Sequence, residues 1–553
     1  MYSTNSHQAD DQDRKWIDRE YALTISVKAA IAAHGGKARK VIMDELTQMV
    51  TKKVWRPIKV SGLTTSERRS IIRSSMFIKE KFFPDCTFEK LKARLVAGGD
   101  KQNRSLYEDL SAPTVLTSSV FAIAAVAAME HRHVMVVDIG GAFLNVPMDT
   151  GVVVHMRLDP IMSKLMTDIS PEYRRYADDK GCIVVALDKA LYGLVESAAL
   201  WNKNLTNTLV KYGFKQNRYD PCVFNMNIRG VQCTVAIHVD DLLITSIDKL
   251  ALEEVANHLQ SVYKDIRRVD GPRVGYLGMM MDLTEKGKAL ITMDGFINDL
   301  LDNSSIDGLA NTPATDHLFV TREDVGTVTE DQRVRFHTMV AKMLYLAKRV
   351  RPECLPTVAF LATRVTKCDQ DDLGKLRRLV RYVRFTKDRG VCLCPTSMEV
   401  STQIDAAYGV HVDGKSHTGS SVCIGDGATV HSKSSKQKNV TKSSTEAELV
   451  ALSDSATQGL HVRNFMREQG HDVGPLVIYQ DNLSTMALIE RGRSTSERSR
   501  HIDIRFFWLK ERVDAGEAVI RHLSTKSMFA NILTKPLQGA QFKTEREGLT
   551  GWV

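Results

Sequence analysis

The sequence has no long apolar run, and it contains few of the features that mark secreted or membrane proteins. No segment of its 553 residues approaches the roughly 20 apolar residues that cross a bilayer as a helix. The start, MYSTNSHQADDQDRK, lacks the apolar core of a secretory signal. The nine cysteines include no Cys-x-x-Cys pair, which favours reduced thiols over a disulfide framework. We therefore expect an intracellular protein with no membrane partner.

Internal repeats and low-complexity tracts are absent too, and what remains has the composition of a packed protein. Hydrophobic residues make up 43% and charged residues 25% of the chain. A length of 553 residues exceeds one ordinary core, and domains of about 100–200 residues predict three or four units. The net charge of +9 fits a polyanionic partner but is too mild for this length to predict one.

Periodic apolar spacing predicts three helices. After a polar start that we expect to be disordered, VIMDELTQMVTKKVW places Ile42, Leu46 and Met49 on one helical face. Small apolar residues from Ser118 to Met129 predict a second helix, which leads into the strand VMVVD. The third, KLRRLVRYVRF, has an apolar stripe flanked by the cations Lys375, Arg378 and Arg381. We interpret these cations as a solvated helix face in preference to a template contact.

A first set of acids follows strands. Asp138 ends VMVVD, and the β-rich arms of VQCTVAIHVDDLLITS place Asp240 and Asp241 at a hairpin turn. An Asp-Asp pair alone is more often only a turn. Carboxylates beside apolar strands are costly without a compensating cation, however. Three acids that converge at strand ends therefore suit a two-metal site for phosphoryl transfer.

A second set of acids lies in a separate α/β pattern that begins near residue 398. Strands come first, and helices and strands then alternate. Asp405 falls in the first strand, Glu448 near the start of a long helix, and Asp481 at the end of LVIYQD. A lone acid at a strand end is usually structural, but this set fits a two-metal hydrolase. Glu446 is better explained as part of a capping box with Ser443.

Seven ordered motifs resemble those of copia-type LTR retrotransposon reverse transcriptases. They are KARLVAGGDKQ, VVDIGGAFLNV, LDKALYGLVESAALW, DPCVF, HVDDLLI, YLGMMM and MLYLAKRVRPE. KSSTEAELVAL and SERSRHIDIRFFWLKERV resemble the family's ribonuclease H segments. The resemblance runs from about Ile42 to Leu537, and motifs at this density rarely arise by chance.

The resemblance implies an α+β and α/β fold class. A right-hand reverse transcriptase of fingers, palm and thumb/connection would precede a ribonuclease H-like domain. The implied boundaries are a polar N-terminal segment at 1–40, fingers and palm at 41–285, thumb/connection at 286–397, the ribonuclease H-like domain at 398–540 and a tail at 541–553.

The family's roles carry over by position. In the polymerase half, the resemblance assigns metal binding to the acids of the first set and nucleotide binding to Lys92, Arg94, Phe143, Tyr192 and Gly193. Phe143 would reject a ribose 2′-hydroxyl, although a core role explains it equally well. In the nuclease half, the metal ligands would be Asp405, Glu448 and Asp481. The hybrid backbone would contact a basic stretch, for which a structural role has equal weight: Arg498, Arg500 and His501.

Several positions depart from the family's pattern. His238 stands for a Tyr, and Gly140-Gly141 for a more polar pair. Val195 and Glu196 replace a Lys-Gln pair, which should weaken phosphate or template attraction locally. Asn531 replaces the last nuclease acid. An amide oxygen brings no charge, so the affinity for a second ion should fall, and Asn531→Asp should raise cleavage.

The implied function is an RNA-directed DNA polymerase with an attached ribonuclease H domain of uncertain activity. It would use Mg²⁺ or Mn²⁺, dNTPs, and an RNA template with a DNA or RNA primer, and act on RNA–DNA hybrid. It would work in the cytoplasm or in virus-like particles, with the nucleus also open. One alternative is a domesticated or weakened remnant that binds nucleic acid without catalysis. A second alternative is a nuclease without polymerase function. It is disfavoured because the incomplete set of acids is that of the nuclease, whereas the polymerase set is complete.

Overall fold

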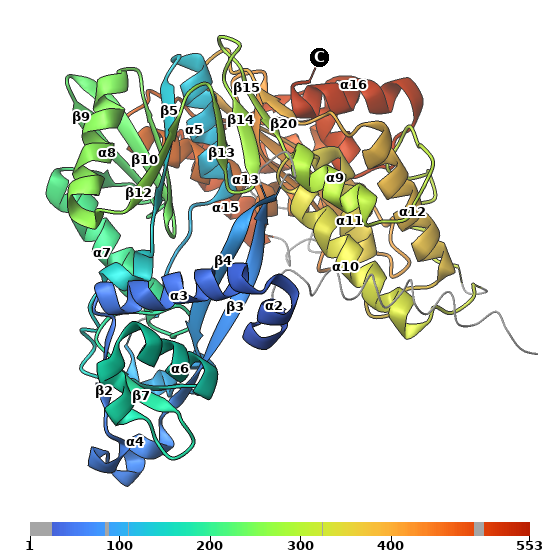
Figure 1. The fold of residues 1–553 in the computed structure, drawn as a ribbon. Coiled ribbons are helices and arrows are strands. Elements are labelled where there is room, and N and C mark those ends of the chain that lie inside the picture. Colours follow the sequence, from blue (N-terminus) through green and yellow to red (C-terminus); the bar gives the residue numbers. More distant parts are fainter. Residues whose placement is uncertain (1–24, 83–87, 109, 323–324, 492–502, 553) are drawn as a thin grey trace, which may run out of the picture. The chain divides into compact units, whose positions relative to one another are not determined.

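The computed structural model describes residues 25–82, 88–108, 110–322, 325–491 and 503–552 (Figure 1). The chain folds into two units, each assembled from segments that are separated in the sequence. Unit 1 comprises Met1–Thr114, Asp138–Phe214 and His258–Arg267, and unit 2 comprises Val115–Val137, Lys215–Asn257 and Arg268–Val553. These units cut across the functional domains expected from the sequence, whose boundaries stay a prediction. The expected disordered start, residues 1–15, lies outside the described residues.

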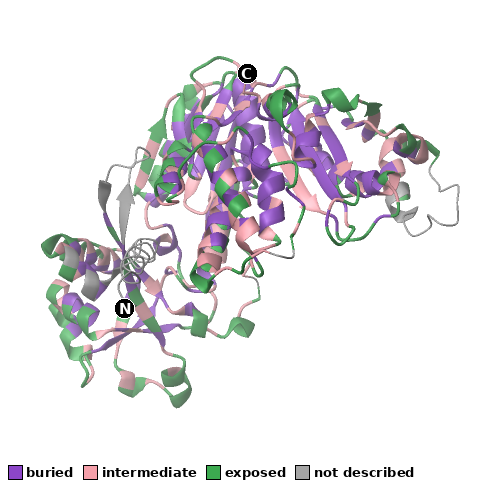
Figure 2. Cartoon of the chain, turned by 90° about the vertical axis from the view of Figure 1, so that its right-hand side faces the viewer, coloured by how far each residue is buried: buried purple, intermediate pink, exposed green. Residues whose placement is uncertain are grey.

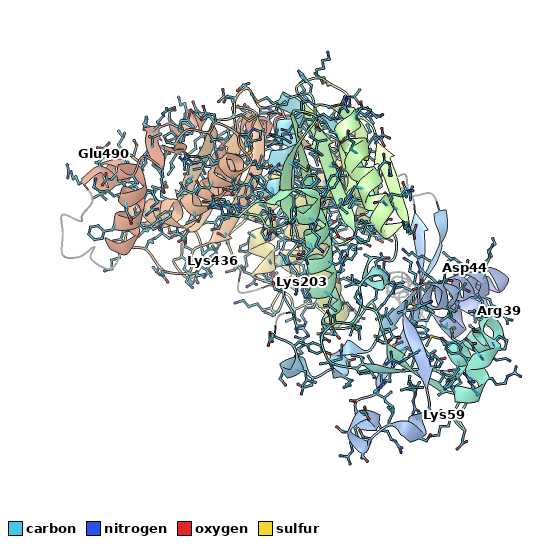
Figure 3. The ribbon with its side chains drawn as sticks, turned by 90° about the vertical axis from the view of Figure 1, so that its left-hand side faces the viewer. Arg39, Asp44, Lys59, Lys203, Lys436 and Glu490 are labelled. Atoms are coloured by element: carbon cyan, nitrogen blue, oxygen red, sulfur yellow. The ribbon has the colours of Figure 1, made fainter. Side chains whose placement is uncertain are left out.

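Unit 1 is built on a six-stranded sheet with the order β1-β3-β6-β7-β2, in which β4 also pairs with β3. Helix α3 (Gly36–Thr51) buries Ala38, Ile42, Leu46 and Met49, so the predicted apolar face is confirmed. Figure 3 shows Asp44 on the exposed side of the same helix. The strands are β1 (Ile25–Ser26), β2 (Trp55–Ile58), β3 (Ile72–Phe82), β4 (Phe88–Ala97), β6 (His155–Leu158) and β7 (Ile183–Leu187).

Helices and short turns complete unit 1. The segment after β5, AFLN, forms a single 3₁₀ turn (Ala142–Asn145) whose first three residues are buried. The other helices that lie wholly in this unit are α2 (Val27–His34), α4 (Thr65–Arg69), α6 (Pro160–Ile169) and α7 (Ser197–Tyr212).

A second six-stranded sheet has the order β12-β5-β11-β10-β9-β8. Its central hairpin joins β10 and β11 in antiparallel register from Cys233↔Ser246 to His238↔Asp241. The predicted hairpin is therefore confirmed. The strands are β5 (His133–Ile139), β8 (Lys215–Gln216), β9 (Val223–Ile228), β10 (Val231–His238), β11 (Asp241–Ser246) and β12 (Ile266–Asp270), and α8 (Lys249–Tyr263) follows β11.

Helix α5 (Thr117–Met129) confirms the predicted apolar helix and explains its composition. Its residues from Ser118 to Ala128 are all buried. Within unit 2 it packs against β11 of the hairpin sheet and against β19 (Ala428–Lys436) and α13 (Ser444–Glu468) of the C-terminal domain. A helix covered on all sides needs no polar face, and small residues let its neighbours approach closely.

A four-stranded sheet, β13-β14-β15-β16, and a helical group follow in unit 2. The cations of α12 hold the segment 307–320: Lys375 Nζ donates to Val320 O at 2.6 Å, Arg378 to Thr312 Oγ1 at 2.8 Å and Arg381 to Asp307 O at 2.7 Å. The predicted solvated face therefore holds for Arg381, which is exposed, but not for Lys375 and Arg378, which are half-buried. The elements are β13 (Arg273–Tyr276), β14 (Met279–Asp282), β15 (Ala289–Thr292), β16 (Val391–Leu393), α9 (Asp294–Asp302), α10 (Glu330–Ala347), α11 (Leu355–Ala362) and α12 (Gln370–Phe385).

The C-terminal part of unit 2 has a five-stranded sheet with the order β19-β18-β17-β20-β21. The first three strands are antiparallel, and β17, β20 and β21 run parallel. Strands β17, β18 and β20 and helix α13 are mostly buried, whereas β19 and β21 are mostly half-buried or exposed (Figure 2). The elements are β17 (Val400–Ala407), β18 (His417–Ile424), β19 (Ala428–Lys436), β20 (Leu476–Gln480), β21 (Ala518–His522), α13 (Ser444–Glu468), α14 (Leu483–Arg491), α15 (Asp503–Asp514) and α16 (Gly539–Thr550).

Among the described residues, no helix combines the length and the apolar character needed to span a membrane.

Candidate polymerase and nuclease sites

Three of the predicted nucleotide-binding side chains meet in unit 1. The Arg94 guanidinium lies 4.1 Å from the centre of the Tyr192 ring. The same ring meets Phe143 edge-on, with 4.6 Å between ring centroids. A cation over an aromatic face is attracted by the ring's quadrupole, which orders the flexible arginine without satisfying its N–H donors. Arg94 is exposed and Phe143 is buried, so the Tyr192 ring links a surface cation to a buried aromatic side chain.

Gly193 permits this arrangement. Its φ is +91°, and an added Cβ would lie 2.2 Å from the carbonyl oxygen of Ala97. The Ala97 N–H donates to the carbonyl of Tyr192 at 2.7 Å. Because Ala97 ends β4, this contact fixes Tyr192 against the strand that carries Arg94. The predicted importance of Gly193 therefore has a local cause, which is the close approach of two backbones.

Strand β4 presents its cations on one face. Leu91, Ala93 and Leu95 are buried, whereas Lys92 and Arg94 are exposed, as alternation along a strand requires. On the helix packed against this strand, Glu45 accepts a hydrogen bond from the Leu95 N–H at 3.0 Å. Burial raises the pKa of the Glu45 carboxyl, and the hydrogen bond from Leu95 and the charges of Lys92 and Arg94 oppose that rise.

Glu196 is buried and hydrogen-bonded within unit 1, and the weaker phosphate or template attraction expected from Val195 and Glu196 stays a prediction. The Glu196 side chain accepts hydrogen bonds from Gln102 Nε2 at 3.0 and 3.3 Å. Gln102 in turn accepts from the Val195 N–H at 3.0 Å. Desolvation and then the nearby Glu196 charge raise the pKa of Tyr107 to about 12. The carboxylate thus ties the segment at 102–107 to the start of α7.

The hairpin places its two acids at the turn. Val239 has φ +58°, a left-handed conformation that is strained for a β-branched residue. Such strain costs about 1–3 kcal/mol and persists where the surroundings fix it, often at functional sites. Asp240 completes the turn and Asp241 begins β11, both half-buried, and His238 pairs with Asp241 across the hairpin.

Asp138 lies on β5, which is adjacent to β11 in the sheet order. Its side chain is exposed, while its neighbours Val137 and Ile139 are buried. Asp138 belongs to unit 1 and the hairpin to unit 2. The approach of the three carboxylates therefore stays a prediction.

The nuclease acids come together. Parallel strands β17 and β20 are in register through Gln403↔Tyr479, and Asp405 and Asp481 each follow two residues later. Glu448 reaches the same place from the second turn of α13. Ligand atoms of the three carboxylates all lie within 4.8 Å of one another, close enough to share one cation. They form the single group of this kind found among the described residues.

Hydrogen bonds fix each acid. Glu448 accepts from the Ala406 N–H at 3.2 Å and from Gln480 Nε2 at 3.3 Å. Asp481 accepts from Thr525 Oγ1 at 2.7 Å. Desolvation, and next the charges of Asp405 and Asp481, raise the pKa of Glu448 to about 9. Clustered buried carboxylates resist full ionisation without a cation, so the chemistry of this donor set favours a bound divalent ion.

Asn531 is held in one orientation beside this cluster. Its Nδ2 donates to the carbonyls of Thr525 at 2.8 Å and Met528 at 2.7 Å. Its Oδ1 accepts from Lys535 Nζ at 2.6 Å, and the same ammonium lies 3.2 Å from Asp405. The sequence-based prediction missed Lys535. The one available signal was its spacing of four residues after Asn531 in a segment already singled out.

The remaining predicted residues divide into two groups. The expected capping box is half formed: the Glu446 N–H donates to Ser443 Oγ at 3.2 Å, but the Glu446 carboxylate accepts from the Lys442 N–H at 2.7 Å and not from that of Ser443. The proposed hybrid contacts lie outside the described residues: Arg498, Arg500 and His501.

Comparison with known families agrees with this geometry. Residues 54–316 match the model of the reverse transcriptase (RNA-dependent DNA polymerase) family. The chain is 23% identical over 474 residues to a retrovirus-related Pol polyprotein from transposon TNT 1-94 of Nicotiana tabacum, covering 84% of this chain and 34% of the relative. It is 26% identical over 482 residues to that from transposon RE1 of Arabidopsis thaliana, covering 86% and 31%. The chain thus spans about a third of the length of these relatives.

A yeast relative and a solved structure extend the comparison. The Transposon Ty1-BL Gag-Pol polyprotein of Saccharomyces cerevisiae is 24% identical over 532 residues, covering 90% of this chain and 28% of the relative. A foamy viral protease-reverse transcriptase in complex with double-stranded DNA superposes with a TM-score of 0.52 at 12% identity, covering 89% of this chain and 70% of that one. The expected fold class, a reverse transcriptase followed by a ribonuclease H-like domain, is confirmed.

Proposed function

Since the chain belongs to the reverse transcriptase family of copia-type retrotransposon polyproteins, we propose that it extends a primer 3′-hydroxyl with dNTPs along an RNA template. The reaction is phosphoryl transfer, in which the protein positions the reactants and stabilises the developing charge. The observation that carries this proposal is the strained hairpin, which presents Asp240 and Asp241 at a turn beside the strand of Asp138.

The three palm acids fit a divalent cation by their chemistry, since carboxylate oxygens are the ligands that Mg²⁺ prefers. Mg²⁺, or Mn²⁺ in its place, would lower the pKa of the attacking hydroxyl and neutralise the triphosphate. The acids would hold it: Asp138 from β5, and Asp240 and Asp241 from the hairpin. In this role the strain at Val239 serves to keep Asp240 at the tip of the turn.

The cluster of Arg94, Tyr192 and Phe143, together with Lys92, would bind the incoming nucleotide. Arg94 offers a planar fork of donors and Lys92 a compact charge, and both suit phosphate oxygens. The Arg94 guanidinium lies over the face of the Tyr192 ring, and Phe143 contacts the same ring edge-on. Phe143 is buried against that ring and cannot easily turn away, so it would exclude a ribose 2′-hydroxyl by its bulk.

For the C-terminal domain we propose a nuclease site that cleaves RNA–DNA hybrid poorly. Asp405, Glu448 and Asp481 fit one divalent ion. The position where a fourth ligand would bind a second ion carries Asn531, whose oxygen already accepts from Lys535. Two-metal hydrolysis needs one ion for the attacking water and one for the leaving oxygen. The residues present do not fit the second ion.

RNA template, DNA or RNA primer and the RNA–DNA hybrid are the proposed partners. The reverse transcriptase with the similar fold was solved with double-stranded DNA. The exposed cations of β4, Lys92 and Arg94, suit a phosphate-bearing ligand.

Primer extension by the full chain tests the polymerase proposal. With Mg²⁺, dNTPs and a primed RNA template, Asp241→Asn should lower extension by about a thousandfold or more, because a metal ligand loses its charge. Asp248→Asn is the matched control. Asp248 lies in the same unit, pairs with Arg229 at 2.8 Å and accepts from the Leu250 N–H, a role that Asn can keep.

Two outcomes would contradict the proposal. Extension that survives Asp241→Asn unchanged would remove the hairpin from the active site. Tight binding of a primed template without any extension would favour the alternative of a nucleic-acid-binding remnant.

A further inference from the structure

The side chain of Lys535 places a positive charge beside the nuclease acid cluster of Asp405, Glu448 and Asp481. Its Nζ lies 3.2 Å from Asp405 and 2.6 Å from Asn531 Oδ1. Asp405 is almost fully buried, with 2% of its side chain exposed, whereas the Lys535 side chain is 39% exposed. The lysine therefore approaches the cluster from the solvent side and pairs with a carboxylate that has no access to water. A buried carboxylate requires such a partner.

We propose that Lys535 is a resident cation of this site, which takes the place of the second divalent ion and limits the acid cluster to one. The inference rests on the proposed function, since it assumes that the cluster binds a metal ion. It goes further by naming the residue that decides how many ions bind.

Asn531 supports this assignment through its orientation. Both hydrogens of Nδ2 are used by backbone carbonyls, so the amide cannot rotate without losing two hydrogen bonds. Oδ1 is therefore fixed toward Lys535. Asn531 is buried, with 1% of its surface exposed, and an unpaired buried amide would cost about 1–3 kcal/mol. An asparagine in this setting serves as an acceptor for the ammonium rather than as an open metal ligand.

Contacts with β17 and β18 also fix the backbone segment before Lys535. Thr534, the preceding residue, donates from Oγ1 to Asp405 Oδ2. Asp405 pairs across the sheet with Gly419 on β18. A Cβ at Gly419 would lie 2.7 Å from Leu533 Cβ and 2.7 Å from Thr534 Cγ2. The absence of that Cβ lets the segment before Lys535 lie directly on the strand next to Asp405.

The charges around the ammonium are predominantly acidic. Besides Asp405, the buried Glu545 of α16 interacts electrostatically with Lys535. Desolvation raises the pKa of Glu545 to about 7, and the charge of Lys535 opposes that rise. One ammonium therefore serves both the acid cluster and the helix that follows it.

Mn²⁺ titration of the full chain, followed by calorimetry and by the melting temperature, tests this inference. Lys535→Met removes the charge and keeps much of the side-chain volume. It should tighten Mn²⁺ binding at this site on the order of tenfold, because a like charge next to the ion is removed. In metal-free buffer it should lower the melting temperature, which Mn²⁺ should restore. Lys535→Arg keeps the charge and should bind Mn²⁺ as the wild type does.

Two further variants separate the possible failures. Lys543→Met, at an exposed position of α16, is the matched control and should change neither Mn²⁺ affinity nor stability. Asp405→Asn should abolish the Mn²⁺ binding that Lys535→Met strengthens. If Asp405→Asn weakens binding but Lys535→Met does not tighten it, the inference about Lys535 is wrong. If Asp405→Asn leaves Mn²⁺ binding intact, the metal site of the proposed nuclease is wrong.

Should Lys535→Met not fold even with Mn²⁺, the inference would also be overturned, because the ion was expected to replace the lost charge. An increased Mn²⁺ affinity of Lys535→Arg would contradict it as well, since the charge would then not be the cause.

Discussion

The hairpin acids and the nuclease acids differ in how the protein compensates their charge. Asp240 and Asp241 are half-buried at a strained turn. Asp405 and Glu448 are buried, and the ammonium of Lys535 already pairs with Asp405. The sequence predicts a set of three acids in each of the two regions. On our proposal, the residues around a set of acids, and not the acids alone, determine how many metal ions the set can bind.

Gly193→Ala should have the largest effect on primer extension after that of Asp241→Asn, and it tests whether the polymerase half depends on the contact of Arg94 with Tyr192. The new Cβ would lie 2.2 Å from the Ala97 carbonyl at φ +91°, so Tyr192 and Arg94 must move. Displacement of positioning groups by about 1 Å can cost on the order of 100-fold in rate. Primer extension should fall by about that factor.

Gly151→Ala is the matched control for this change. Gly151 also has a positive φ of +71°, but nothing lies within 4 Å of its added Cβ. It should therefore show backbone strain without loss of extension. Equal losses of extension in both variants would mean that backbone strain, and not the displacement of Tyr192 and Arg94, is responsible.

Glu448→Gln tests the charge balance of the nuclease cluster. Glu448, whose pKa is raised to about 9, keeps its proton in the folded protein over a range where the unfolded chain has lost it. Its stability contribution is present below the ordinary value of 4.5 and is lost as the pH rises toward 9. In metal-free buffer at pH 8, Glu448→Gln should therefore be more stable than the wild type by about 4–5 kcal/mol.

Denaturant unfolding at several pH values provides the measurement. The two proteins should have similar stability near pH 4.5, and saturating Mg²⁺ should remove the difference at pH 8 by stabilising the ionised carboxylate. Parallel stability profiles from pH 5 to pH 8 would show that the cluster does not hold back the ionisation of Glu448.

Asn531→Asp adds an acid at the position where the nuclease set lacks one, whereas the polymerase set is complete. The sequence suggests that an acid here should raise cleavage. The structure reverses that expectation, because one carboxylate oxygen would face the carbonyls of Thr525 and Met528 at the present 2.7–2.8 Å. We expect a loss of about 1–3 kcal/mol in unfolding free energy and no gain in hybrid cleavage.

Asn103→Asp controls for the same chemical change. Asn103 accepts from the Ser105 N–H at an exposed cap, a role that Asp fills equally well, so stability should not change. Faster hybrid cleavage by Asn531→Asp would support the simpler explanation from the sequence, which is that the nuclease site is weak because it lacks one negative charge.

Asn217→Ala should have the smallest of these effects and asks whether the hairpin sheet and the nuclease-like domain unfold together. Asn217 is buried and donates to the Phe465 carbonyl of α13 at 3.1 Å. Its loss should cost about 1–2 kcal/mol within a single unfolding transition. Its neighbour Arg218 pairs with Glu468 but is 81% exposed, so Arg218→Ala should shift the melting temperature by less than about 2 °C. Two separate transitions would contradict a shared core.

Much of the fold could be predicted from the sequence because it depends on local patterns. Apolar spacing indicated the buried face of α3, β-rich arms indicated the hairpin, and the order of strands and helices indicated the C-terminal domain. The motifs also brought Arg94, Phe143 and Tyr192 to attention before their contacts were known. These features arise from periodicity or from a run of adjacent residues.

The features that could not be predicted depend on interactions between distant segments. Glu196 reads as an added surface charge, but Gln102 and Tyr107 bury it. Asn531 reads as a weakened ligand, yet its amide is fixed by Thr525 and Met528. The cations of α12 read as solvated, whereas carbonyls of a distant loop bind two of them. In each case the orientation of a polar side chain is set by tertiary packing, on which sequence spacing gives no information.

The most direct test of the account compares the two activities of the wild-type chain on one substrate. A labelled RNA template annealed to a DNA primer, incubated with Mg²⁺ and dNTPs, reports primer extension and hybrid cleavage in the same reaction. The account predicts clear extension, with cleavage slower by about 100-fold or more, because the nuclease site lacks the ligands for a second ion. Cleavage as fast as extension, or cleavage without extension, would contradict it.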